Sequence, residues 1–594
     1  MNRILKTENS AEDAAKYDNT DLFDVYRISD FPEVKSLLQD IHDELQSEGL
    51  IPRYAKNASR FRDNVRLTIL NLCAVYLNDP DKYVAYHRNE RRYKKGTRLH
   101  KFRISYHYLI EVIIDGFLKP KGYIEDKKGH RFSDSQKISR MRPTKRFVER
   151  FIESNKVTLP MITFDDRREL IVLRNEKKED IPYEDNAFTR KARENLELIN
   201  QVIDQNVILL ALSNQDLNLM NKMLRDSKNK VRRLGGSVDF TRTRLRRIFS
   251  RSSWEQGGRY YSAWWHRVPN RKIKLRRHLT INGITTVEPD FDGLHINMLY
   301  AKEGIPMPEG DVYHLEGYSN DDTFRQFVKR MLLVMVNATR EHDVRSALHE
   351  AVHEKGDLEV PEEVGSTSSM DIDPIRHAFA KKHEPIAHYL ASDVGIDLQY
   401  WDSVLAEYIM VHFAQQGIPC LPVHDSYIID FRYEDELIQV MKEGFKALFK
   451  QECGLKVKHS TGVYDLEWTF VHYLKWMDGK YTDEDAERDE MWLNTHFSRY
   501  NQLLGQFADA KGVELEQPVL REIPQEVLNQ MRNMVDSYKA KRGKPVKKDT
   551  PRTLLSDHID NPHKIKMVTP TAMKQFKLLR ERAFQPKQTK PQLL

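Results

Sequence analysis

Two aspartates follow short apolar, strand-like segments and are well suited to hold divalent cations. Asp290 ends the segment TTVEPD and precedes a helix-like FDGLHINMLYA, and Asp425 lies at the tip of LPVHDSYIID. Hard cations such as Mg²⁺ prefer carboxylate oxygens, and two such ions about 4 Å apart catalyse phosphoryl transfer. A lone aspartate after a strand more often caps a turn or a helix. The pair therefore indicates catalysis only if the two strands are neighbours in one sheet.

Between the two aspartates, Arg325, Lys329, Leu333 and Asn337 recur at every fourth position. This spacing predicts one stripe along a helix, and we expect a single long helix over Asp321–Val352. Two cations at one end of the stripe would grip a triphosphate, and the later positions would face the base and sugar. The alternative is an ordinary surface helix with unpaired cations.

The three segments together resemble the superfamily of the family A DNA polymerases and the single-subunit RNA polymerases. VEPDFDGLHINMLYA is similar to polymerase motif A, PVHDSYIID to motif C, and the Arg325–Lys329 spacing to the fingers helix. The resemblance implies that Asp290, Asp425 and the main-chain carbonyl of Phe291 hold two Mg²⁺ ions, for which Mn²⁺ can substitute. It also implies that Arg325 and Lys329 bind the triphosphate.

Two more segments match in the same chain order. GGRYY…VPNRKIKL resembles the segment that contacts the primer-template minor groove, which makes Arg259 a primer-terminus contact. GIDLQYWDSVLAEYIM resembles a helix that begins with a template- and primer-contacting Gln, here Gln399. His424, beside Asp425, is expected to support the motif C hairpin and the nucleic acid. The resemblance covers residues 257–430 and nothing outside them.

Three positions depart from the family pattern and concern the choice of sugar. His295 stands where DNA polymerases have Glu and RNA polymerases have Gly, Asn337 replaces the fingers Tyr, and Ser426 replaces the Glu after motif C. The resemblance implies that His295 faces the 2′ carbon of the nucleotide. DNA synthesis is slightly favoured, and RNA or primer synthesis is the alternative. Asp292 is a secondary metal ligand candidate.

The predicted fold class is α+β, a right-hand polymerase with palm, fingers and thumb behind a mostly helical, winged-helix-like domain. The expected divisions are an N-terminal segment (1–50), the winged-helix-like domain (51–155), a connector and helical thumb (156–256), a first palm segment (257–317), fingers (318–400), a second palm segment (401–475), a helical extension (476–536) and a basic tail (537–594). The thumb is expected to be an elongated antiparallel helix pair over Ala187–Leu234.

The N-terminal half carries a basic segment suited to nucleic acid. Arg91, Arg92, Lys94 and Lys95 are interleaved with Tyr86 and Tyr93, a mixture of cations and rings that nucleic-acid surfaces use. Lys127–Arg140 is expected to form the wing. A charged helix face on an ordinary helical domain is the alternative.

Composition limits the remaining possibilities. The 594 residues require several domains, since single cores rarely exceed about 300 residues. Three scattered cysteines argue against a disulfide framework and against structural zinc. No apolar run approaches the roughly 18 residues of a membrane span, which predicts a soluble, cytoplasmic protein without a membrane partner. Residues 539–594 hold 15 Lys/Arg and four Asp/Glu, which suits phosphate-backbone contact; a solvated tail without function is the alternative.

The expected function is template-directed nucleotidyl transfer on a DNA or RNA template-primer with nucleoside triphosphates. The rival from another class is a non-catalytic nucleic-acid-binding replication or regulatory protein with a degenerate polymerase fold. The three departures favour that rival. Retention of both aspartates together with the Arg325–Lys329 pair opposes it, because close carboxylates repel each other and a purely structural palm does not need them.

Overall fold

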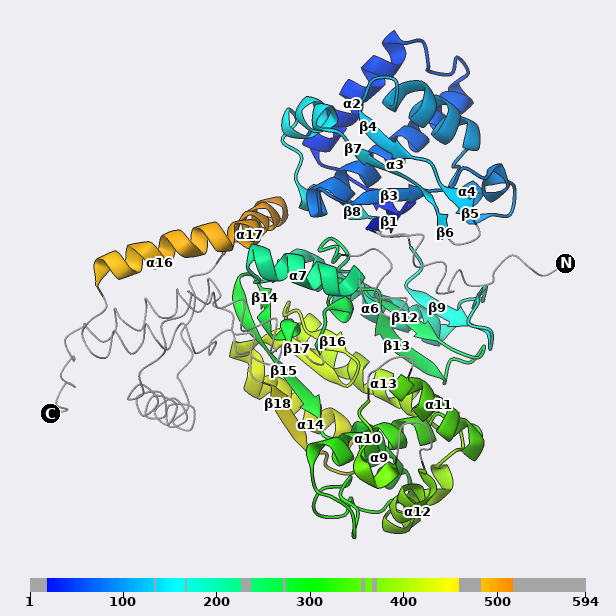
Figure 1. Ribbon diagram of the computed structural model, residues 1–594, viewed down its shortest axis with the longest axis vertical. Helices are drawn as coiled ribbons and strands as arrows, with labels where there is room; N and C mark the ends of the chain where they lie inside the picture. The colour runs from blue at the N-terminus through cyan, green and yellow to red at the C-terminus, as the bar shows by residue number, and fades with distance from the viewer. Residues whose placement is uncertain are drawn as a thin grey trace.

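The computed structural model describes residues 19–132, 135–165, 168–225, 237–270, 274–353, 358–365, 371–458 and 482–515. The chain mixes helices and strands and forms an N-terminal module above a larger body (Figure 1). Each of the two has its own hydrophobic core, one running from Val25 to Ile162 and the other from Leu159 to Ala508. The expected basic tail and the end of the helical extension lie outside the described residues.

The N-terminal module packs helices against a mixed four-stranded sheet of order β1-β3-β7-β4. Its elements are β1 (Thr20–Leu22), β2 (Arg27–Ile28), α2 (Pro32–Ser47), α3 (Ala55–Asn78), β3 (Tyr83–Tyr86), η1 (Glu90–Tyr93), α4 (Arg98–Lys101), η2 (His107–Leu118), β4 (Ile124–Lys127), β5 (His130–Phe132), β6 (Ser135–Lys137), β7 (Ser139–Pro143), α5 (Lys145–Phe147), η3 (Val148–Glu153), η4 (Leu159–Met161) and β8 (Thr163–Phe164).

Two expectations for this module need correction. The boundary expected at residue 51 is wrong, because Val34, Leu37 and Ile41 on α2 are buried in the same core as α3. The expected hairpin exists as β4 and β7, with β5 and β6 between them, but β7 also pairs with β3 and is part of the central sheet. The hairpin is therefore not a separate wing.

The body begins with a second four-stranded sheet of order β10-β9-β12-β13. Its strands are β9 (Ile171–Arg174), β10 (Asp180–Ile181), β12 (Arg246–Phe249) and β13 (Gly257–Tyr261). The expected first palm segment (257–317) thus begins with β13, which pairs with β12 and belongs to this second sheet. Helix α13 (Gly395–Ala414) packs across β13 and connects this sheet to the rest of the body.

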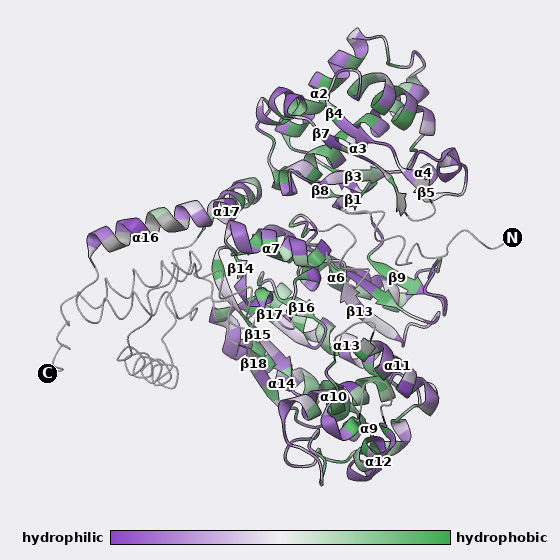
Figure 2. Ribbon diagram, viewed as in Figure 1, coloured by the Kyte–Doolittle hydropathy of each residue, from purple (hydrophilic) through white to green (hydrophobic). Residues whose placement is uncertain are grey.

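A six-stranded sheet forms the centre of the body, with order β11-β14-β15-β17-β16 and with β18 also paired to β15. Its strands are β11 (Ile208–Leu210), β14 (Leu279–Ile281), β15 (Ile284–Phe291), β16 (Leu421–Val423), β17 (Ser426–Asp430) and β18 (Leu455–Lys458). Nearly all residues of β11, β14, β15, β16 and β17 are buried, whereas α16 is largely hydrophilic (Figure 2).

The expected antiparallel helix pair over Ala187–Leu234 is wrong. Helices α6 (Ala187–Gln205) and α7 (Asn214–Arg225) are separated by β11, which pairs with β14 in the central sheet. The run Val207–Leu212 is entirely apolar and buried, so it enters the sheet instead of a helix turn. Residues 226–234 of the expected pair lie outside the described residues.

The remaining elements of the body are helical and lie between β13 and β14, between β15 and β16, or after β17. They are η5 (Trp264–Arg267), η6 (Leu275–His278), α9 (Leu294–Lys302), α10 (Asp322–Met335), α11 (Glu341–His353), η7 (Glu362–Val364), α12 (Asp373–Lys382), η8 (Glu384–Tyr389), η9 (Phe431–Tyr433), α14 (Glu434–Phe449), α16 (Asp483–His496) and α17 (Ser498–Lys511).

The single long helix expected over Asp321–Val352 is wrong, because α10 ends at Met335 and α11 begins at Glu341. The main-chain amides of Ala391 and Gly395 donate to the carbonyls of Met335 and Val336 at 2.8 and 2.7 Å. Carbonyls at a helix C-terminus need such partners when the helix does not continue. The segment before α13 therefore ends α10, and Asn337 lies just beyond it.

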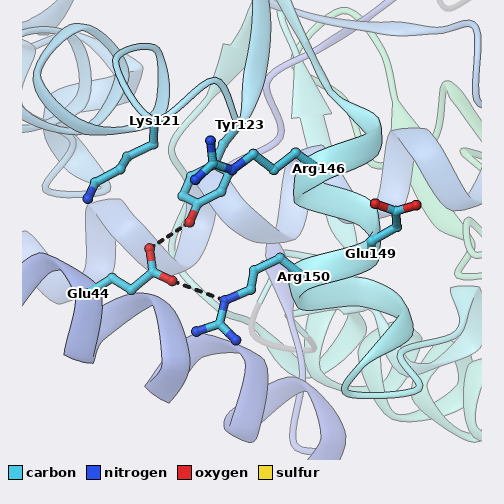
Figure 3. A pocket seen from close by; sticks show the side chains of 6 residues that line it. All are labelled: Glu44, Lys121, Tyr123, Arg146, Glu149 and Arg150. Atoms are coloured by element: carbon cyan, nitrogen blue, oxygen red, sulfur yellow. Dashed lines mark hydrogen bonds and ion pairs between the residues drawn. The ribbon is translucent and has the colours of Figure 1, made fainter.

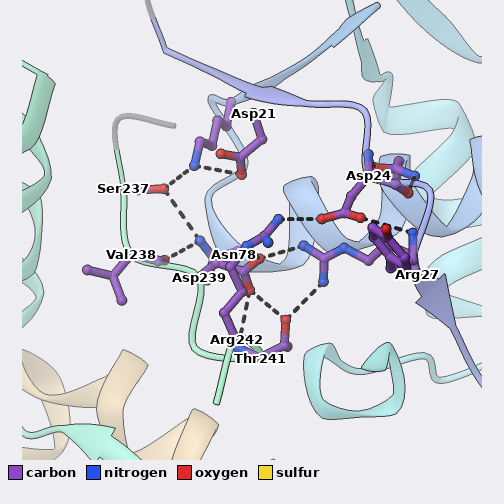
Figure 4. A network of polar contacts seen from close by, with 12 residues as sticks. Asp21, Asp24, Arg27, Asn78, Ser237, Val238, Asp239, Thr241 and Arg242 are labelled. Atoms are coloured by element: carbon purple, nitrogen blue, oxygen red, sulfur yellow. Dashed lines mark hydrogen bonds and ion pairs between the residues drawn. The ribbon is translucent and has the colours of Figure 1, made fainter. Parts of the chain in front are cut away.

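A buried polar network joins the N-terminal module to the body (Figure 4). Arg27 donates to Asp239 at 2.5 Å, and both side chains are almost fully buried. Lys82 pairs with Asp21 at 2.8 Å and donates to the Ser237 hydroxyl at 2.6 Å. Desolvation opposes the ionised Asp239, yet Arg27 and Arg242 hold its pKa well below the usual range. Paired buried charges with satisfied hydrogen bonds fix the geometry of such a junction.

Candidate active site

The central sheet brings Asp290 and Asp425 together. Strands β15 and β17 are antiparallel, Asp290 lies directly opposite Ser426, and the amide of Phe291 donates to the carbonyl of Asp425 at 3.3 Å. Direct partners in such a pair lie about 4.5–5.5 Å apart at their Cα atoms. Asp425 is the residue before Ser426, so it lies next to the direct partner of Asp290 at the end of the sheet. The two aspartates are 135 positions apart in sequence.

The turn that carries Asp425 has an unusual backbone. Val423 pairs with Ser426, so His424 and Asp425 form a two-residue hairpin turn. His424 has a φ of +59°, a conformation that favours glycine and costs a β-carbon-bearing residue roughly 1–2 kcal/mol. Its exposed ring lies 6.4 Å from the ring of Tyr261. Strain of this kind is typical of functional sites.

His295 is half-buried at the start of α9, four residues after Phe291. A ring nitrogen of His295 lies 3.1 Å from the guanidinium of Arg259, and Arg259 donates to Asp402 at 2.6 Å. Burial and the nearby Arg259 lower the pKa of His295 to about 4, although Asp425 acts in the opposite direction. His295 is therefore neutral near pH 7.

Asp402 is a site residue that the motif comparison did not identify. It is fully buried on α13, and burial raises its pKa to about 6 even though the Arg259 pair lowers it; Asp425 raises it further. The charged carboxylate of Asp402 fixes Arg259, and Arg259 orients His295. Gln399 is half-buried one turn earlier on the same face of α13.

The cation stripe lies on the outer face of α10. Phe324, Phe327 and Val328 are buried on the other side, whereas Lys329 and Leu333 are exposed and Arg325 is partly so. Asn337 follows the end of the helix, where its side chain donates to the Leu333 carbonyl at 2.6 Å and lies against Gly395. The predicted stripe is confirmed over three positions and not at the fourth.

Tyr313 connects the stripe to the aspartates and was also missed by the motif comparison. Its ring centroid lies 5.1 Å from the Arg325 guanidinium carbon and 5.9 Å from the Lys329 amine. Burial raises the pKa of Tyr313 to about 12, with Asp292 and Asp425 adding to the rise. The Tyr313 ring is thus close enough to interact with both the α10 cations and these carboxylates. Arg325 itself pairs with Asp311 at 2.5 Å.

The other predicted residues lie in several places. Asp292 pairs with Lys456 at 2.6 Å, next to Asp290. Ser426 donates to Glu288 at 2.8 Å, and Glu288 is held by Arg276. A buried carboxylate on β15 therefore neighbours the position where the resembling DNA polymerases have Glu. No sequence signal separated Glu288 from an ordinary strand residue.

Arg91, Arg92, Lys94 and Lys95 are exposed in the N-terminal module, within or just after η1, and do not join the site. Tyr86 and Tyr93 are buried, so they are not available to stack on bases, and that element of the expectation is wrong. A separate surface pocket of this module holds Tyr123 and Arg150, which both donate to Glu44 at 2.7 and 3.2 Å (Figure 3).

The donors expected at the sheet end are the carboxylates of Asp290 and Asp425 and the main-chain carbonyl of Phe291. All three are oxygen ligands, the kind that Mg²⁺ prefers. Within the described ranges, no group of three or more His, Cys, Asp or Glu residues is arranged to hold a metal. Mg²⁺ commonly uses one or two carboxylates with waters and substrate phosphates, so a larger protein cage is not required.

No protein-family model matches this chain, and no curated protein sequence matches it significantly. No helix among the described residues is long and apolar enough to cross a membrane. The function proposed below therefore depends on the motifs and on the geometry of the site.

Proposed function

We propose that this chain is a template-directed nucleotidyltransferase, a nucleic-acid polymerase that uses two Mg²⁺ ions and deoxynucleoside triphosphates. The observation that carries the proposal is the pairing of β15 with β17, which sets Asp290 beside Asp425. Sequence segments 135 residues apart converge there in the order that a polymerase palm requires. The central sheet would be the palm, and the helices from α10 to α12 would belong to the fingers.

The proposed mechanism assigns a role to each element of the site. Asp290, Asp425 and the Phe291 carbonyl would hold the metal ions, which lower the pKa of the attacking hydroxyl and neutralise the leaving pyrophosphate. Arg325 and Lys329 stabilise negative charge on the triphosphate, and Arg325 exchanges Asp311 for a phosphate oxygen as the nucleotide enters.

Three residues beside the aspartates, Asp402, Arg259 and His295, would position the substrates. Asp402 fixes Arg259, whose remaining donors face the primer terminus, and Arg259 holds the neutral His295 against the sugar of the incoming nucleotide. A neutral, half-buried ring occupies space without adding charge beside the metal ligands. This arrangement supports discrimination against a 2′-hydroxyl by a steric clash.

The direct test is nucleotide incorporation by the purified full chain with Mg²⁺, on primed and unprimed DNA and RNA templates, with each nucleotide pool separately. The proposal expects extension of a primed template with deoxynucleotides. Synthesis with ribonucleotides alone would indicate an RNA polymerase or a primer-synthesising enzyme instead of a DNA polymerase. The absence of incorporation on every template would favour the non-catalytic binding protein.

A further inference from the structure

A pocket rich in arginine lies where the N-terminal module meets the β9-β12-β13 sheet. Arg168, Arg242, Arg244 and Arg246 line it together with Phe164 and Ser262, and Asp165 is the one acidic residue among the described residues of its wall. Four guanidinium groups around one concavity repel one another unless anions lie between them. The way these charges are balanced therefore decides what the pocket is for.

Two of the four arginines are neutralised by the protein. Arg242 pairs with Asp24 at 2.8 Å and with Asp239 at 3.1 Å, and Arg244 pairs with Glu197 at 2.7 Å. The Arg242–Asp24 pair is one of the contacts that hold the module on the body, whereas Arg244 and Glu197 both lie in the body. Arg242 and Arg244 form fixed walls of the pocket.

The other two arginines, Arg168 and Arg246, have no carboxylate within ion-pair distance among the described residues. The Nε of Arg246 donates to the Glu169 main-chain carbonyl at 2.9 Å, and Arg168 stacks over the Tyr26 ring, 4.8 Å from its centroid. Burial and the charge of Arg246 lower the pKa of Arg168 to about 10, and burial also lowers the pKa of Arg246. Asp24 near Arg168, and Asp180 and Glu169 near Arg246, offset only part of this effect, so a further anion would stabilise both charges.

One face of the β12-β13 pair connects the pocket to the candidate active site. Arg246 lies directly opposite Tyr261 in the sheet, so their side chains share one face, and Arg259 lies two residues before Tyr261 on that face. Tyr261 in turn neighbours His424, the residue before Asp425. A row of cationic and aromatic side chains thus leads from the aspartates to Arg168.

From this geometry we infer that the pocket binds backbone phosphates of the nucleic-acid strand that passes through the active site. The inference deepens the proposed function and rests on it for the identity of the strand. A row of cations with interleaved rings is the form that single-strand grooves take. Planar guanidinium groups bind phosphate oxygens in pairs. A free phosphate would also fit the charges of the pocket, but it would not contact the row of cationic and aromatic side chains that leads to the aspartates.

The test is the salt dependence of binding of a fluorescent single-stranded oligonucleotide to the full chain, measured by anisotropy in EDTA and without nucleotide. Each phosphate contact contributes about 0.7 to the log–log slope for single strands. The double variant Arg168→Gln/Arg246→Gln should lower the slope by about 1.4 and weaken binding about tenfold at roughly 0.15 M salt. Arg62→Gln/Arg190→Gln removes two exposed arginines elsewhere and is the matched control.

Folding and specificity are checked in the same experiment. Removal of unpaired charges relieves repulsion, so the thermal midpoint of the double variant should equal or exceed that of the wild type, and Arg168→Lys/Arg246→Lys should recover most of the slope. Equal slopes for the double variant and its control would overturn the inference. The inference would also be overturned if inorganic phosphate raised the thermal midpoint of the wild type while all variants bound the oligonucleotide with equal affinity. That result would indicate a site for a free anion.

This test does not depend on catalysis. Because EDTA removes the metal ions, a chain that incorporates no nucleotide can still pass it, and an active polymerase can still fail it. Failure of the inference and failure of the proposed function are therefore distinguishable.

Discussion

Asp402→Asn isolates the charge of the residue that fixes Arg259. Asn has nearly the same size as Asp and keeps an oxygen that can accept from Arg259, but it does not titrate. Burial raises the pKa of Asp402 from the ordinary 3.8 to about 6. At 1.36 kcal/mol for each pKa unit, this rise corresponds to about 3 kcal/mol.

The sign follows from proton binding. Between pH 4 and 6 the folded chain holds a proton on Asp402 that the unfolded chain has released, so Asp402 makes the free energy of unfolding fall as pH rises through this window. His295 acts in the opposite direction, because burial lowers its pKa from 6.5 to about 4. The folded chain then binds fewer protons there than the unfolded chain. The two contributions nearly cancel in the wild type.

Asp402→Asn should therefore expose the His295 contribution alone. We expect the stability of the variant, relative to the wild type, to fall by about 3 kcal/mol on acidification from pH 6.5 to 4, because only the variant lacks the compensating proton uptake. Urea unfolding followed by tryptophan fluorescence reports on this core, since Trp264 and Trp265 are buried in it. Parallel stability profiles for the two chains would refute the reasoning, because Asp402 would then titrate like an exposed carboxyl.

Three further predictions concern His295, Arg325 on α10, and the junction between the module and the body. His295→Gly should raise ribonucleotide use relative to deoxynucleotide use, by about tenfold for each 1.4 kcal/mol of clash removed, as measured by competition between matched pools; an unchanged ratio would exclude His295 as the gate. Arg325→Gln should raise the nucleotide KM and lower kcat/KM by about tenfold or more, because a charged hydrogen bond contributes about 1.5–3 kcal/mol, whereas Arg345→Gln on α11 should change neither. Arg27→Met should destabilise the chain by about 3–5 kcal/mol in urea unfolding, because it leaves the buried Asp239 with one arginine fewer, and a cost below about 1 kcal/mol would contradict the account of the junction.

Local patterns predicted the strands that carry the aspartates. The apolar segments before Asp290 and around Asp425 form β15 and the β16-β17 hairpin, and the four-residue spacing from Arg325 to Leu333 gives one helix face. These features depend on residues close together in sequence. Pairing of β15 with β17 followed only from the order of the motifs.

Features set by distant contacts were missed. The end of α10 depends on amides from residues 391 and 395, and the entry of β11 into the sheet depends on its pairing with β14. Asp402 is one acidic residue on a helix until the fold places Arg259 beside it. The domain boundary expected at residue 51 was wrong because the sequence of α2 is that of an ordinary amphipathic helix. Only its packing against α3 assigns it to the N-terminal module.

Magnesium-dependent nucleotide incorporation by Asp425→Asn, compared with Asp435→Asn, tests the central claim most directly. Asp435 is exposed on α14, so its amide variant controls for the loss of one negative charge. The account predicts that Asp425→Asn abolishes incorporation and retains the wild-type affinity for primer-template, while Asp435→Asn behaves like the wild type. Incorporation by Asp425→Asn at the wild-type rate would contradict the assignment of Asp425 as a metal ligand and, with it, the polymerase site.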